Sequence, residues 1–244
     1  MPGVLFGVML LGLVGLAAVL VAYRRQEMRA EHELVGPHDD LALARSLAEA
    51  DLALVHSDLN AQPVLIDTVR DLGDNDLAAN LDQELTHLNG LADGLAGDLA
   101  AAENPAAVQA VTATLADIRR GLCLITARVS GEALPGTRPP CFFNPNHGPS
   151  STVVAWTASS GSSVRVPSCD ADAERLRSGA SPYSRTVARD GARVAWWEAG
   201  SPVRPWARGW YRTWLDSSSG REAQTAFPSL GESVTPPDAG QQAS

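Results

Sequence analysis

Cysteine, histidine and aspartate are residue types that bind metal ions, and the C-terminal half of the chain places four of them at suggestive spacings: Cys141, His147, Cys169 and Asp172. A structural zinc ion takes four ligands in a tetrahedron, drawn from cysteine, histidine and acidic side chains. Asp172 follows Cys169 at a helical spacing of three residues, whereas Cys141 and His147 enclose a turn-rich loop, CFFNPNH, that is wider than the usual zinc knuckle. We predict a zinc site made of these four residues, with Asp170 as the alternative fourth ligand.

Other uses of these side chains stay open at this point. The thiols of Cys141 and Cys169 can remain reduced and pack in the core, or they can form a disulfide if this part of the chain faces an oxidising compartment. An enzyme would use His147 together with Cys141 or Cys169. The sequence contains no phosphate-binding glycine loop, no G-x-S-x-G elbow and no H-E-x-x-H motif, which favours a non-enzymatic protein.

The elements that must position the ligands form a small β-rich α+β module, predicted over residues 141–215. The segments STVVAWT and SVRVPSC are rich in β-branched residues, and the intervening ASSGS predicts a hairpin. The segment DADAERLRSG after Cys169 predicts a short helix, and SRTVA and ARVAWWEAG around RDG predict a second hairpin. This order resembles a treble-clef zinc layout, in which a knuckle and a helix N-terminus each supply two ligands.

The segment before the module, residues 38–130, has helical periodicity throughout. Two apolar stripes recur at spacings of three and four residues, which places each stripe on one face of a helix. Their members are Leu77, Leu81, Leu85, Leu88, Leu91, Leu95 and Leu99 in one stripe and Val108, Val111, Leu115, Ile118, Leu122, Ile125 and Val129 in the other. Between them, Asn104 and Pro105 predict a helix start, so we expect an antiparallel helical hairpin.

Further helices are expected upstream of this hairpin. One is predicted from about Asp39 to Leu59, and another begins near Pro63 and either breaks or bends at Gly73. Three or four helices then pack as a bundle, and the fold class is mainly α. We expect the stripes to form the bundle core. The alternative is a coiled-coil surface for self-association or for a protein partner.

An apolar stretch opens the chain. Residues 4–22, VLFGVMLLGLVGLAAVLVA, carry no charge, and a helix of this length, about 28 Å, can cross the bilayer. Arg24, Arg25 and Arg29 follow it, and basic flanks stay on the cytoplasmic side. We therefore expect a single-pass plasma-membrane protein with its N-terminus outside and its bulk in the cytoplasm. The disulfide alternative requires the module to face outward instead.

These segments give the expected organisation of the whole chain. A Pro/Gly-rich stretch, GEALPGTRPP, separates the bundle from the module, and a polar stretch follows the module. The parts are a transmembrane anchor (1–23), a juxtamembrane stalk (24–37), a helical bundle (38–130), a linker (131–140), the Cys/His module (141–215) and a disordered tail (216–244).

The distribution of charged and aromatic residues indicates which kinds of molecule the protein could bind. Residues 24–130 carry 18 acidic and 8 basic side chains, so we expect no binding of nucleic acid there. The module is richer in arginine and contains Trp196, Trp197, Trp206, Trp210 and Trp214. We expect these rings to form its core. The alternatives are contact with anionic lipid headgroups and contact with a protein or nucleic acid partner.

The segments PPCFFNPNHGPS, VPSCDADAERL and ARVAWWEAGSPVRPWARGWY resemble a C-terminal module, marked by CFFxPxHG, of membrane-anchored actinobacterial proteins of uncharacterised function. In that family a transmembrane span and a helical region usually precede the module. The resemblance is close over residues 139–211 and implies an envelope-associated protein, but it implies no activity. The combined expectation is a non-enzymatic membrane-anchored scaffold or interaction protein that binds a protein partner or the membrane surface.

Overall fold

The computed structural model of this 244-residue chain describes residues 40–158, 161–189, 191–227 and 229–231. The predicted membrane anchor and stalk lie outside these residues. Within the described ranges, none of the helices combines the length and the apolar character that crossing a membrane requires.

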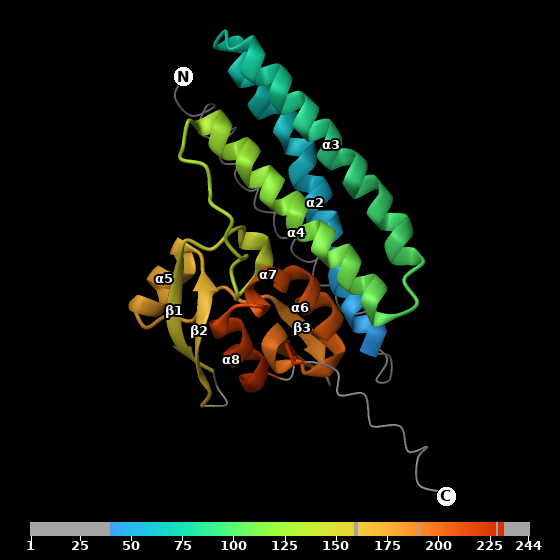
Figure 1. Ribbon diagram of the computed structural model, residues 1–244, viewed down its shortest axis with the longest axis vertical. Helices are drawn as coiled ribbons and strands as arrows, with labels where there is room; N and C mark the ends of the chain where they lie inside the picture. Colours follow the sequence, from blue (N-terminus) through green and yellow to red (C-terminus); the bar gives the residue numbers. More distant parts are fainter. Residues whose placement is uncertain (1–39, 159–160, 190, 228, 232–244) are drawn as a thin grey trace, which may run out of the picture.

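Three long antiparallel helices form the bundle: α2 (Asp40–Asp71), α3 (Asn75–Ala100) and α4 (Pro105–Ser130) (Figure 1). Gly73, with a φ of +94°, lies in the turn between the first two helices, a conformation that favours glycine. The Asp74 and Asn104 side chains cap α3 and α4 by accepting backbone N–H hydrogen bonds at 3.0 Å each. The predicted helix start at Asn104 and Pro105 is therefore confirmed.

The two predicted apolar stripes face the interior of the bundle. Their members are buried, except Leu77, Leu91 and Val129, which are partly buried against the same core. The first helix contributes a third apolar face that includes Leu43, Leu47, Leu52, Val55 and Leu59. The mainly helical class and the antiparallel packing are as we predicted.

Helix α2 differs from the prediction because it continues through Pro63, where we expected a new helix to begin. A proline inside a helix removes a backbone hydrogen bond and costs about 3 kcal/mol. Ile66 and Val69, beyond the proline, are buried in the bundle core. Burial of these side chains offsets the cost of the proline, so the described bundle has three helices.

The C-terminal region is a small α+β unit that contains both predicted hairpins. Strands β1 (Thr152–Thr157) and β2 (Ser163–Ser168) pair antiparallel, as do β3 (Thr186–Arg189) and β4 (Ala192–Ala195). The predicted short helix is α5 (Asp170–Arg177). The remaining elements are the 3-10 turns η1 (Pro145–His147), η2 (Trp196–Glu198) and η3 (Ser201–Val203) and the helices α6 (Arg204–Trp210), α7 (Arg212–Leu215) and α8 (Ser218–Ala226).

Helix α8 lies in the segment that we expected to be a disordered tail, and for these residues that prediction is wrong. The Ser217 hydroxyl caps the helix by accepting from Gly220 N–H at 3.1 Å. Beyond the helix, Phe227 and Leu230 are buried, and the Phe227 ring stacks on Trp156 with centroids 6.0 Å apart. These apolar anchors hold the polar segment on the module. Residues 232–244 of the predicted tail lie outside the described residues.

Aromatic rings form the core of the C-terminal unit. All five tryptophans between Trp196 and Trp214 are buried, as we expected for a core role. Phe142 lies among them, with ring centroids 5.0 Å from Trp196 and 5.3 Å from Trp197. The Trp196 indole donates to Phe142 O at 2.8 Å, and the Tyr211 hydroxyl donates to the same carbonyl at 3.0 Å. The CFFNPNH loop is thereby anchored in the aromatic core.

Candidate metal centre

The loop that carries Cys141 and His147 is closed by backbone hydrogen bonds. Cys141 N–H donates to Gly148 O at 3.0 Å, and an isolated bridge joins Pro140 to Pro149. Inside the loop, the Asn144 side chain accepts from Asn146 N–H at 3.0 Å and starts the 3-10 turn η1. The turn folds the five intervening residues back on themselves. A spacing that is wide in sequence therefore still brings the thiol and the imidazole together.

Cys169 and Asp172 lie at the start of α5. Cys169 is the extended N-cap residue, with φ −71° and ψ 163°, and Asp172 follows one helical turn later. Strand β2 leads directly into this helix, and its end is held against the loop because Phe142 N–H donates to Pro167 O at 2.8 Å. The hairpin therefore places the helix start beside the loop, so that the two pairs of ligands meet.

The donor atoms of Cys141, His147, Cys169 and Asp172 all lie within 4.8 Å of one another. Asp172 Oδ2 is 2.9 Å from His147 Nδ1, 3.3 Å from Cys141 Sγ and 3.4 Å from Cys169 Sγ. Cys169 Sγ is 3.7 Å from His147 Nδ1. Zinc ligands on bonds of about 2.0–2.3 Å in a tetrahedron are separated by about 3.3–3.8 Å. The cluster is thus close to the size of a zinc coordination shell, and these residues could hold such an ion.

The charges in the cluster favour a cation. The hydrogen bond from the Cys141 thiol stabilises the Cys169 thiolate and lowers the pKa of Cys169 to about 5, while the same bond raises the pKa of Cys141. The pKa of His147 is raised, chiefly by its hydrogen bond to Cys169. The Asp172 side chain is 0% exposed, and its Oδ1 accepts from Tyr183 N–H at 2.8 Å, which leaves Oδ2 for the cluster. The lowered pKa of Cys169 favours its thiolate form, which is the form that binds a metal ion.

The same geometry does not fit a catalytic triad. In a Cys-His-Asp triad the acid binds the ring nitrogen opposite the one that faces the nucleophile, because the histidine must shuttle a proton between them. Here both Cys169 Sγ and Asp172 Oδ2 approach Nδ1 of His147. Convergence of several donors on one point is the arrangement of a metal site.

All three cysteines of the chain lie in its described part, and all three are free thiols. The structure therefore has no disulfide between Cys141 and Cys169. Of the two acidic residues that we considered as the fourth ligand, Asp172 joins the cluster and Asp170 does not. The Asp170 carboxylate instead accepts from the Ser151 hydroxyl at 2.6 Å.

A buried polar hub under the loop was not predicted. Asp51 of α2 is 0% exposed, and its carboxylate accepts from the indoles of Trp206 at 2.7 Å and Trp210 at 3.0 Å. It also accepts from the Asn146 amide at 2.7 Å and pairs with Arg185 at 3.2 Å. Asn146 precedes the candidate ligand His147, so the hub fixes the loop to the bundle. No local pattern could have identified it, since its members come from four separate segments.

Comparison of the chain with known proteins found no matching family model, no matching curated protein and no matching solved structure.

Proposed function

We propose that this protein is a non-enzymatic, membrane-anchored scaffold or interaction protein whose C-terminal module is stabilised by zinc. The observation that carries the proposal is the convergence of Cys141, His147, Cys169 and Asp172 on one point. Two sulfurs, one imidazole and one carboxylate form a donor set that suits zinc. Four protein ligands complete a tetrahedron and leave no open position for water or substrate. The metal would therefore act in folding and not in catalysis.

The order of the elements supports this assignment. A knuckle-like loop, the β1–β2 hairpin and the start of α5 follow one another, and the loop and the helix each supply two ligands. This layout resembles a treble clef. It also agrees with the resemblance of residues 139–211 to the actinobacterial module.

The membrane part of the proposal rests on the uncharged residues 4–22 and on the arginines that follow them. This orientation places the module in the cytoplasm, where thiols stay reduced and available to a metal. A bundle and a module held at the membrane by one helix provide a surface for a protein partner close to the lipid.

The test is the metal content of the full chain, purified in detergent without chelator. We expect about one equivalent of zinc by mass spectrometry, and less than a tenth of an equivalent in Cys141→Ser and Asp172→Asn. Cys123→Ser is the matched control, because Cys123 lies outside the cluster, and it should retain the metal. Less than a tenth of an equivalent in the unaltered chain would overturn the metal assignment.

The orientation is tested by proteolysis of sealed right-side-out vesicles. The module should be protected until the vesicles are opened. Its removal by protease added outside would place the bulk of the chain on the other side of the membrane.

A further inference from the structure

The two cysteines of the candidate metal centre also form a pair with each other. The Sγ atoms of Cys141 and Cys169 lie within 4.8 Å of each other, and the two thiols share a hydrogen bond. The backbones are adjacent as well, because Phe142 N–H donates to Pro167 O at 2.8 Å. A disulfide has an S–S bond of about 2.05 Å, so an approach of less than about 3 Å would join the sulfurs. Rotation of the side chains between staggered positions can supply such a movement.

The two thiols differ in their access to solvent. Cys141 is 0% exposed, whereas Cys169 is partly exposed at the start of α5. An oxidant in solution therefore meets Cys169 first, while Cys141 is shielded from it. This arrangement is typical of redox-sensing pairs, in which an accessible cysteine reacts and a neighbouring cysteine resolves the product.

The third cysteine of the chain lies outside this pair. Cys123 belongs to α4, and its sulfur is not a member of the four-residue cluster. Burial raises the pKa of the Cys123 thiol, which disfavours the reactive thiolate. An oxidant should therefore distinguish the pair from Cys123 within one chain.

We propose that Cys141 and Cys169 are a redox-sensitive pair that a hydroperoxide oxidises to a disulfide, and that this oxidation dismantles the metal centre. The disulfide removes both sulfurs from coordination and leaves His147 and Asp172 as the remaining ligands. Two ligands do not complete the tetrahedron of a structural zinc site, so the ion is released. The release of zinc rests on the proposed function, whereas the formation of the disulfide does not.

The reaction consumes one hydroperoxide per chain in two steps. The Cys169 thiolate first attacks the peroxide: an S–O bond forms, the O–O bond breaks, and the leaving hydroxide or alkoxide takes a proton from solvent. Cys169 is thereby oxidised by two electrons to a sulfenic acid, and the peroxide is reduced to water or an alcohol. The Cys141 sulfur then attacks Cys169: the S–S bond forms, the S–O bond breaks, and the hydroxide leaves as water with the Cys141 proton. A dithiol reductant restores both thiols.

The test treats the full chain, purified in detergent without chelator, with a small excess of tert-butyl hydroperoxide. Disulfides are mapped by mass spectrometry of alkylated peptides, and released zinc is measured with a chromogenic chelator. We expect the Cys141–Cys169 disulfide in most chains, the release of about one equivalent of zinc, and recovery of both thiols with dithiothreitol. Free Cys141 and Cys169 thiols after treatment, or disulfides that involve Cys123, would overturn the proposal.

The order of the two steps is tested with dimedone, which traps sulfenic acids. In the unaltered chain, dimedone should label Cys169 at early times and leave Cys141 unlabelled, so this result does not depend on the folding of a variant. Cys141→Ser should accumulate the adduct at Cys169, and Cys169→Ser should slow the oxidation of Cys141 at least tenfold. Cys123→Ser is the matched control and should react as the unaltered chain does. Labelling of Cys141 before Cys169 would contradict the assigned roles.

The zinc content before oxidation separates the two proposals. If a chain purified without zinc forms the Cys141–Cys169 disulfide, the redox pair is sustained and the metal centre is refuted. If a chain with about one equivalent of zinc keeps its metal and both thiols under peroxide, the metal centre is sustained and the redox pair is refuted.

Discussion

The bundle and the C-terminal module have cores built from different kinds of side chain. The bundle buries leucine, isoleucine and valine in repeated layers along three helices. The module instead buries large rings around Phe142, together with the charged Asp51 that the bundle supplies. Its candidate metal cluster lies at the edge of this aromatic core.

This difference determines how each part responds to change. Aliphatic layers share the stabilisation among many similar contacts, so the loss of one side chain leaves the pattern intact. The module depends on a few groups that each satisfy several partners. Asp51 is the extreme case, since its one carboxylate engages four donors of the module, one of which, Asn146, lies in the loop beside the candidate metal centre.

Removal of the proposed zinc ion should have the largest effect and should separate the two regions most clearly. A structural zinc ion contributes about 10–16 kcal/mol of apparent binding free energy in small zinc domains. After chelation, we expect the near-ultraviolet circular dichroism of the buried tryptophans to be lost and the far-ultraviolet helical signal of the bundle to remain. If the near-ultraviolet spectrum were unchanged in a chain shown to be free of metal, the module would not depend on zinc and would not differ from the bundle in this respect.

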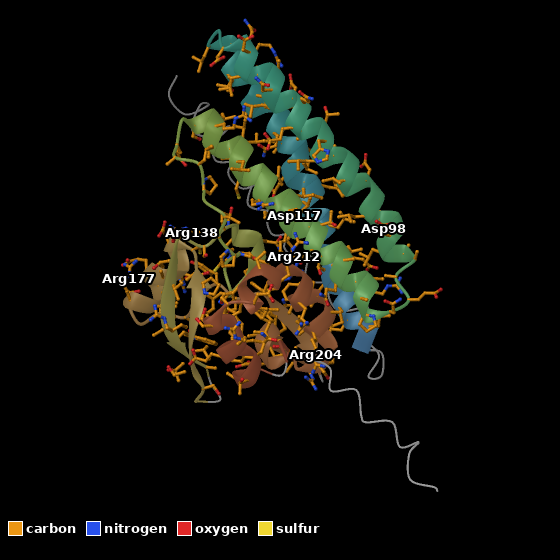
Figure 2. The ribbon with its side chains drawn as sticks, in the orientation of Figure 1. Asp98, Asp117, Arg138, Arg177, Arg204 and Arg212 are labelled. Atoms are coloured by element: carbon orange, nitrogen blue, oxygen red, sulfur yellow. The ribbon has the colours of Figure 1, made fainter. Side chains whose placement is uncertain are left out.

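Asp51→Ala should destabilise the fold by about 3–5 kcal/mol in urea unfolding, because it leaves the Arg185 guanidinium, whose side chain is only 14% exposed, without its carboxylate partner. The two indole N–H groups also lose their acceptor. Asp98→Ala, at an exposed position on α3, is the matched control (Figure 2). It should change the free energy of unfolding by less than about 0.5 kcal/mol. A cost below 1 kcal/mol for Asp51→Ala would show that the hub does not join the two regions.

Gly209→Ala tests the packing of α6 on α4. A Cβ at this position would lie 1.8 Å from Thr112 Oγ1 and 2.4 Å from Gln109 O, and the latter is backbone that cannot rotate away. We expect a loss of about 1–3 kcal/mol from overpacking. Gly97→Ala, in an open position on α3, should instead stabilise the helix by up to about 1 kcal/mol. Thermal melts of both variants test this. If both substitutions changed the melting temperature in the same direction, the close approach of α6 to α4 would be contradicted.

Asp117→Asn should have the smallest effect. Asp117 of α4 and Arg212 of α7 lie close together across the boundary between the two regions, with 2.6 Å between Oδ2 and Nη2 (Figure 2). Both side chains are more than a third exposed, so the pair contributes less than about 1 kcal/mol and is screened by salt. The urea midpoints of the unaltered chain and the variant should differ slightly at low ionic strength, and this difference should disappear at high ionic strength. A larger loss of stability that did not depend on salt would show that this ion pair contributes as a buried contact and not as a surface pair.

Much of the candidate site was predictable because each half of it is local in sequence. Cys169 and Asp172 share one helical turn, and Cys141 and His147 share one loop, so residue type and spacing were enough to nominate them. The choice of Asp172 over Asp170 follows from helix geometry. That the two halves meet depends on the β1–β2 hairpin, which the β-branched segments also indicated.

The rest of the molecule depended on contacts between distant segments. The continuation of α2 through Pro63 reflects burial of Ile66 and Val69, and the helix α8 reflects anchoring by Phe227. The cleft of about 450 Å³ that Gln62, Arg119 and His147 help to line exists only because α2 and α4 pack beside the loop.

The sequence alone therefore determined the apolar faces of the helices, the cap at Asn104 and the candidate ligands Cys141, His147 and Cys169, because periodicity, capping and spacing act over a few residues. Tertiary structure alone decided which buried polar groups find partners. Asp51 is 95 residues from Asn146 and 155 from Trp206, and no short-range pattern encodes such a pairing. The pairing is settled by the cost of leaving a charge unpaired inside a packed core.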